Sequence, residues 1–174
     1  MLRGASIVAT LVALALPLAA GAAGDGRASV AREPSLESLV FQRINEVRAA
    51  HGLGRLTPSP GLTRAAVIHS RSMVVNGFFA HESRNGAPFW KRLQTFYGPR
   101  TNGWTVGENL AMFGGARPDA ASIVESWMAS PPHRANLLSK HFSNAGVAIL
   151  YDEAAGGVYG GEPTWVVTLD VGAR

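Results

Sequence analysis

The sequence predicts an α+β domain in which helices pack against an antiparallel sheet. Two observations lead to this class. Four segments with helical periodicity and end signals come first along the chain, and two runs of β-branched and apolar residues close it. Helices that precede strands, without strand–helix–strand repeats, are typical of α+β folds and not of parallel α/β sheets. Residues 35–174 are predicted to form the one domain, since a domain commonly contains about 150 residues.

Four helices are expected, at residues 35–50, 60–76, 88–97 and 118–129. In the first, Ser35 is a good N-cap, and apolar side chains recur every three or four residues. The second follows Ser59, has Pro60 in its first turn and stops at Gly77. His69 lies on the apolar stripe of this second helix, so we expect it to face inward.

Three antiparallel strands are expected. Residues 145–151 and 164–171 are β-branched and apolar, and a third strand is expected near residues 106–112. The connecting segment 152–163 contains four glycines and is long for a hairpin loop, so we predict that it is mobile.

The N-terminus has the features of a secretory signal peptide over residues 1–23. One basic residue precedes an apolar run at residues 7–20, and small residues in an Ala-x-Ala pattern follow. The run is shorter than the roughly 20 residues that cross a bilayer, so a retained anchor is the less favoured alternative. We therefore expect a secreted or periplasmic protein without stable membrane insertion after cleavage, and a flexible leader over residues 24–34.

Composition excludes several functional classes. The absence of cysteine rules out disulfides, thiolate zinc sites and a cysteine nucleophile. The formal net charge of +4 comes from scattered arginines without a long basic run, which does not favour nucleic-acid binding. Neither a P-loop nor a dinucleotide fingerprint is present. The single-copy motifs specify no oligomeric state.

The histidines supply the candidate chemistry. His51 ends the first helix and His141 lies in a polar loop, so local roles are expected for both. His81 follows an aromatic turn, and His133 follows two prolines that disfavour a helix, so both are expected on rigid non-helical segments. Together with Glu108 they are the minimum set for divalent-metal binding or acid–base chemistry. The alternatives are a helix cap for His81 and a bond to a nearby carbonyl for His133.

From residue 41 onward, the chain resembles the CAP superfamily, also called SCP domains, and in particular its bacterial secreted branch. Five segments occur in the order of that family: INEVR at 44–48, AVIHSRSM at 66–73, FFAH at 78–81, GENLA at 107–111 and WMASPPHRANLL at 127–138. The resemblance implies a three-layer α-β-α sandwich, with about four helices around a three-stranded sheet and a cleft across one side.

The same resemblance implies the content of the cleft. Animal and plant relatives carry two His and two Glu that can hold zinc, and His81, Glu108 and His133 match three of these places. Ser130 stands where the fourth place has Glu, which lowers the expected metal affinity. The expected cleft therefore contains five residues: His69, His81, Glu108, Ser130 and His133. Zn²⁺ is the one cofactor expected, and His81 and His133 would hold it with support from Glu108. For His69 the alternative is a satisfied core histidine.

Two functions follow as expectations. Lipid and sterol binding by relatives favours a secreted module that captures a small amphipathic, lipid or envelope-derived ligand, with or without a divalent ion. The alternative is a metal-assisted, peptidase-like extracellular hydrolase with His81, Glu108 and His133 as catalytic candidates. A third possibility is an adhesion or signalling surface outside the cleft. Because no nucleophile with its base is recognisable, binding is preferred over catalysis.

Overall fold

The structure is a computed structural model that describes residues 30–99 and 103–174. The expected signal peptide and most of the expected leader lie outside these residues. The described part contains five α-helices, a short 3₁₀ turn and five strands. In chain order they are β1 (Ala31–Arg32), α1 (Pro34–Ala50), β2 (Thr57–Pro58), α2 (Pro60–Asn76), α3 (Phe89–Tyr97), β3 (Thr105–Gly114), α4 (Ala120–Ala129), α5 (Pro131–Leu137), β4 (Asn144–Ala155), the 3₁₀ turn (Gly157–Tyr159) and β5 (Glu162–Ala173).

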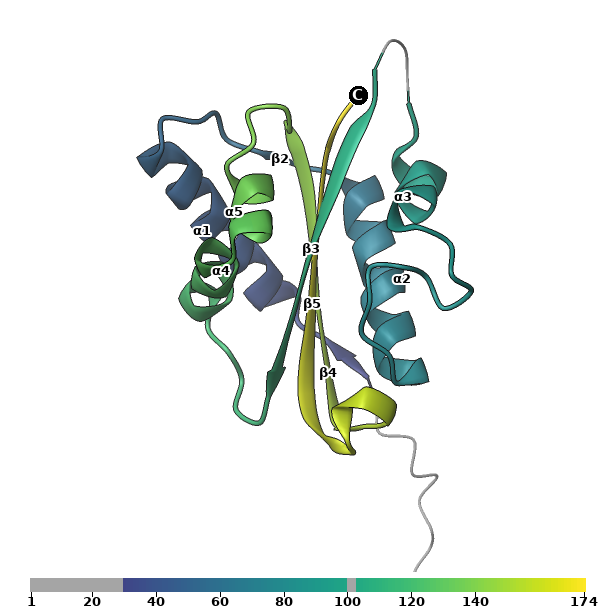
Figure 1. Ribbon diagram of the computed structural model, residues 1–174. Helices are drawn as coiled ribbons and strands as arrows, with labels where there is room; N and C mark the ends of the chain where they lie inside the picture. The colour runs from purple at the N-terminus through teal and green to yellow at the C-terminus, as the bar shows by residue number, and fades with distance from the viewer. Residues whose placement is uncertain (1–29, 100–102) are drawn as a thin grey trace, which may run out of the picture.

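The elements form three layers with the sheet in the middle. Figure 1 shows α1, α4 and α5 on one face of the sheet and α2 and α3 on the other. The strands lie in the order β1-β4-β5-β3 with antiparallel neighbours, and β2 pairs parallel with β4. The predicted α+β sandwich class is therefore confirmed, with one helix and two short strands more than expected. No helix in the described ranges is long and apolar enough to cross a membrane.

Apolar side chains of the sheet alternate between the two helical layers, as strand geometry requires. On the α1 side, Trp127 is the largest fully buried side chain, and its indole N–H donates to Leu110 O at 3.1 Å. Each face has its own cluster of buried residues. Both sheet faces are thus covered, and the sheet ends at β3 on one side and at the short strands β1 and β2, which pair with β4, on the other.

The fifth helix corrects one expectation. Pro131 and Pro132 occupy the first turn of α5, so His133 lies on a helix and not on a non-helical turn. Proline is tolerated there because the first-turn N–H groups have no partner within the helix. Helix α1 also begins one residue earlier than predicted, at Pro34, and Ser35 is therefore not its N-cap.

Two segments that were expected to be flexible are tied to the sheet. Residues 31–32 pair with β4, so the ordered chain begins before the predicted end of the leader. The expected mobile connection 152–163 is strand at both ends, over 152–155 and 162–163, and its central turn is anchored beside the end of α2. There the N–H of Val158 donates to Gly77 O at 3.0 Å and the hydroxyl of Tyr159 donates to Phe78 O at 2.7 Å.

Candidate functional site

The site starts at the end of α2, where the chain reverses toward β3. Gly77 adopts a left-handed conformation, which suits glycine, and ends the helix. The segment that follows brings His81 over β3, where its Nδ1 lies 2.8 Å from Glu108 Oε1. The imidazole is 45% exposed, whereas the Glu108 side chain is fully buried. The Nε2 edge of the ring therefore faces solvent, while Nδ1 is held by the buried Glu108 carboxylate.

Arg92, on α3, is the second partner of Glu108. One terminal nitrogen donates to Glu108 Oε2, and the other donates to Ser83 Oγ at 3.1 Å. Burial raises the pKa of Glu108, but the bond to His81 and the charge of Arg92 outweigh burial and hold that pKa below its ordinary value. Glu108 is thus a carboxylate whose two oxygens are both engaged.

Asp170 lies directly across the β3–β5 ladder from Glu108 and is fully buried. Burial raises the pKa of Asp170 well above its ordinary value, and the negative charge of Glu108 raises it further. Neither carboxyl oxygen of Asp170 has a hydrogen-bond partner among the described residues, so burial beside Glu108 favours its protonated form. Sequence analysis missed both Arg92 and Asp170. A usable signal existed for Asp170, because it is the one charged residue in the apolar run of residues 164–171.

His133 reaches the site from α5, which hydrogen bonds hold against β3. Asn136 Nδ2 donates to Glu108 O at 3.2 Å and to Asn109 Oδ1 at 2.8 Å, while Asn109 Nδ2 donates to His133 O at 3.0 Å. Arg48 of α1 donates to the carbonyl of Leu137 at the end of α5. Partial burial and the nearby His81 lower the pKa of His133, so this ring is neutral near pH 7.

His81, Glu108 and His133 share one open cavity of about 470 Å³ at the β3 edge of the sheet. Six further residues line the cavity, and three of them, Phe89, Val106 and Pro132, have apolar side chains suited to a hydrocarbon group. The other three are Glu82, Gly107 and Asn136. Three side chains that lie 25 and 27 residues apart along the chain therefore meet at one surface hollow.

Two predicted members do not line this cavity. His69 is buried, and its Nε2–H donates to Ala80 O at 2.8 Å, so it braces the residue before His81. Burial lowers the pKa of His69 to about 4, which keeps the ring neutral. Ser130 lies at the junction of α4 and α5 and is absent from the lining residues. The expected five-residue cleft is thus reduced to three of its members.

The donor set does not fit a zinc centre with three protein ligands. Both Glu108 oxygens are held by His81 and Arg92, and one nitrogen of His81 is occupied by Glu108. Within residues 30–99 and 103–174, no group of three His, Cys, Asp or Glu side chains is arranged to hold a metal ion. The imidazoles of His81 and His133 remain, and the Glu82 carboxylate on the same lining does not complete a group with them. Zinc sites normally use three or four protein ligands.

The family follows from the sequence match. A model of the cysteine-rich secretory protein family, CAP, matches residues 41–169. The chain belongs to the CAP family. This match spans β3, α5 and most of the sheet, so the CAP domain includes all the residues of the cavity. The family name refers to cysteines that this chain does not contain.

Bacterial proteins are among the relatives of this CAP domain. It is 32% identical over 112 residues to "Uncharacterized protein YkwD" and 28% identical over 113 residues to "Uncharacterized membrane protein YlbC", both of Bacillus subtilis (strain 168). These alignments cover 64% and 65% of the chain, but only 41% and 31% of the two relatives. The chain therefore matches less than half the length of either protein.

Solved structures share the fold. An extracellular protein containing an SCP domain from Bacillus anthracis superposes with a TM-score of 0.64 and 26% identity, over 82% of this chain and 41% of that one. An outer surface protein from Borrelia burgdorferi gives a TM-score of 0.68 at 16% identity, over 84% and 99% of the two chains. The CAP fold is thus recognisable in coordinates even where few residues are shared.

Proposed function

We propose that this CAP domain acts outside the cytoplasm and binds a small amphipathic or envelope-derived ligand in the cavity of His81, Glu108 and His133. The observation that carries the proposal is the half-exposed ring of His81, whose Nδ1 is fixed on a buried carboxylate at the floor of an open cavity. The similar Bacillus anthracis protein is described as extracellular, which supports export of this chain.

The charges in the cavity favour a ligand with an anionic or oxygen-bearing head group. The bond to Glu108 raises the pKa of His81 despite its partial burial, so the imidazolium form persists to higher pH than in a free histidine. Its free N–H can then donate a charge-assisted hydrogen bond. Phe89, Val106 and Pro132 offer apolar contacts for the rest of the ligand. The carboxylate of Glu82 lies on the same lining and repels an anionic group placed beside it.

A hydrolytic function has less support. Glu108 could orient His81 as a base, but within the described ranges no serine or threonine hydroxyl is hydrogen-bonded to His81 or His133. Two imidazoles without a third ligand also make a weak metal site. Binding without a chemical step is therefore the function that the geometry supports best.

The test uses a fluorescent fatty acid, 11-(dansylamino)undecanoic acid, titrated into the purified protein. We expect saturable binding that weakens about tenfold in His81→Gln, because a charge-assisted hydrogen bond is lost. The matched control is His141→Gln, which removes an exposed histidine outside the cavity and should leave the affinity unchanged. Affinity should also fall as pH rises through the pKa of His81. Equal affinity of wild type and His81→Gln would contradict the proposal.

Two further measurements separate the alternatives. Calorimetric titration of Zn²⁺ into wild type, His81→Ala and His133→Ala reports whether the two rings hold metal, and identical heats would remove the metal site. Incubation with a peptide library and cell-wall fragments tests for turnover. Turnover that Glu108→Gln abolishes would establish the hydrolase and overturn the preference for binding.

A further inference from the structure

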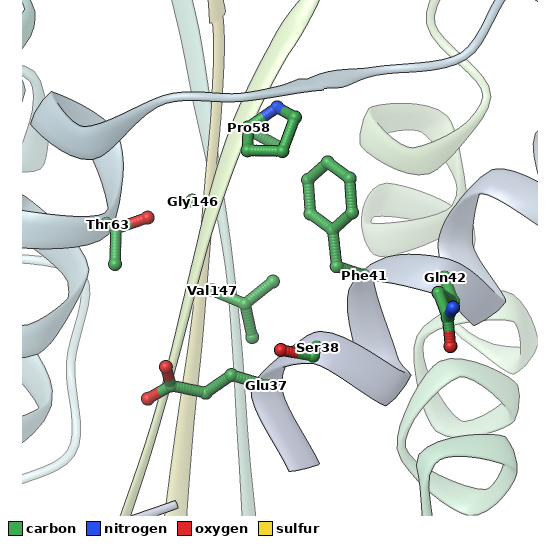
Figure 2. Close-up of a pocket in the computed structure, with 9 residues that line it drawn as sticks. Glu37, Ser38, Phe41, Gln42, Pro58, Thr63, Gly146 and Val147 are labelled. Atoms are coloured by element: carbon green, nitrogen blue, oxygen red, sulfur yellow. The ribbon is translucent and has the colours of Figure 1, made fainter. Parts of the chain in front are cut away.

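A second cavity lies at the opposite edge of the sheet from His81, against the outer side of β4. It has a volume of about 360 Å³ and is formed where α1, α2, β2 and β4 meet. Figure 2 shows Val147 between Phe41 on one side and Thr63 on the other, with Pro58 above and Glu37 below. This volume is at the lower end of the range for small-molecule pockets, so it suits a small group and not a long chain.

The backbone of β4 turns a donor and an acceptor toward this cavity. In an antiparallel strand, alternate residues direct their N–H and C=O groups to the same neighbour. Ala145 and Ile149 both direct these groups away from β5: Ser59 N donates to Ala145 O at 2.8 Å, and Glu33 N donates to Ile149 O at 3.0 Å. Val147 lies midway between them, so its N–H and C=O have the same outward direction.

The groups that complete this edge stop on either side of Val147. Strand β2 pairs with residues 144–145, and strand β1 pairs with residues 150–151. The carboxylate of Glu37 accepts the N–H of Ile149 at 3.0 Å and thereby takes the place of a strand carbonyl. Within the described ranges, no hydrogen bond satisfies the outward N–H and C=O of Val147. The gap is one residue long.

We infer that this gap is a binding site for one residue of a short extended peptide. The N–H and C=O of such a residue belong to successive amides and face the same side, whereas a single trans amide points its N–H and C=O in opposite directions. The C=O of the bound residue accepts the N–H of Val147, and its N–H donates to the carbonyl of Val147, as in a hydrogen-bonded pair of an added strand. Groups flanking the bound residue contact Phe41 and Pro58, and the hydroxyl of Thr63 lies on the same lining. The hydroxyl of Ser38 donates to Pro34 O at 3.0 Å, so it can only accept a hydrogen bond from a polar substituent. Glu37 is already bound by Arg32, so the site has no free charge to attract a cationic ligand.

A residue flanked by two amides is the minimum ligand that makes both bonds, and the two probes test this requirement. N-acetyl-L-alanine N′-methylamide and N-acetylglucosamine are titrated separately into the ¹⁵N-labelled protein. With N-acetyl-L-alanine N′-methylamide we expect a saturable shift of the Val147 amide resonance, and about tenfold slower hydrogen exchange of that amide at saturation. N-acetylglucosamine has a single amide, cannot make both bonds and is the control that should leave this resonance unchanged.

Two variants test the location. Ser38→Phe places a ring on the α1 side of the cavity and should abolish the shift. Ser35→Phe makes the same change at an exposed serine of α1 that does not line the cavity, and should preserve the shift.

Three results would overturn the inference. One is a Val147 amide already protected from exchange without a probe. Another is the absence of a shift with N-acetyl-L-alanine N′-methylamide or an equal shift with N-acetylglucosamine, and the third is a set of shifts confined to residues around His81.

Discussion

The buried pair of Arg92 and Glu108 gives the sharpest test of how the site is held together. The Arg92 side chain is 6% exposed and that of Glu108 is fully buried, so neither charge is screened by water. Arg92→Met keeps the apolar stem but leaves the carboxylate without its strongest counter-charge. Breaking a buried pair by removing one partner costs about 3–5 kcal/mol, and we expect a loss of that size in the free energy of unfolding near neutral pH.

The pH dependence shows whether charge is the cause. In wild type the pKa of Glu108 is lowered, so its stabilising contribution is present above the unfolded pKa and is lost as pH falls through the folded pKa. Without Arg92, burial dominates and the pKa of Glu108 rises. The carboxyl then protonates in mild acid, where it no longer needs a counter-charge. The difference between wild type and Arg92→Met should therefore shrink as pH falls.

Urea denaturation followed by tryptophan fluorescence, at about pH 7 and about pH 4.5, measures both effects. Arg84→Met is the control: it removes an exposed arginine from the same region and should change stability by no more than about 0.5 kcal/mol. Adding Glu108→Gln to Arg92→Met should regain most of the loss, because the unpaired charge is gone. Equal losses at both pH values, or no recovery in the double variant, would refute the electrostatic explanation.

Two further predictions concern His69 and Gly146. Because burial lowers the pKa of His69 to about 4, the unfolded chain takes up a proton that the fold excludes, and stability falls as pH drops below 6.5. In urea denaturation, the free energy of unfolding of His69→Gln should fall by about 2 kcal/mol less than that of wild type between pH 6.5 and about pH 5. Equal losses in the two proteins would contradict this. A Cβ on Gly146 would lie 2.1 Å from Thr63 N, so Gly146→Ala should cost about 3 kcal/mol. Gly114→Ala, whose Cβ meets open space, should melt almost as wild type does in a thermal scan.

The long elements were predictable because their signals are local. Helix α2 has its cap at Ser59, a first-turn proline and a terminal glycine, and it spans the predicted residues. Strands β1 and β2 contain two residues each, so they carry no alternation and exist only because the edge of β4 is available. Helix α5 was missed because two successive prolines were interpreted as a barrier, although they occupy the helix start, where their missing N–H groups cost nothing.

The candidate site was predictable only in part, and the reason is burial. Family motifs placed His81, Glu108 and His133, and the structure brings these three to one cavity. Arg92 and Asp170 were missed because their roles depend on a contact with Glu108 across 16 and 62 positions of sequence, and spacing does not encode such a contact. Ser130 matched a family position but lies outside the cavity lining, so a motif match alone does not place a side chain in a site.

The orientation of the His81 ring depends on residues that do not line the cavity. His69 holds the carbonyl of Ala80, and Tyr159 holds the carbonyl of Phe78, so the segment before His81 is fixed at two points from α2 and from the turn between β4 and β5. The bond to the Glu108 carboxylate orients the His81 ring only if the backbone beneath the ring does not move. The inward face of α2 therefore contributes to the site through its buried histidine, although His69 does not line the cavity.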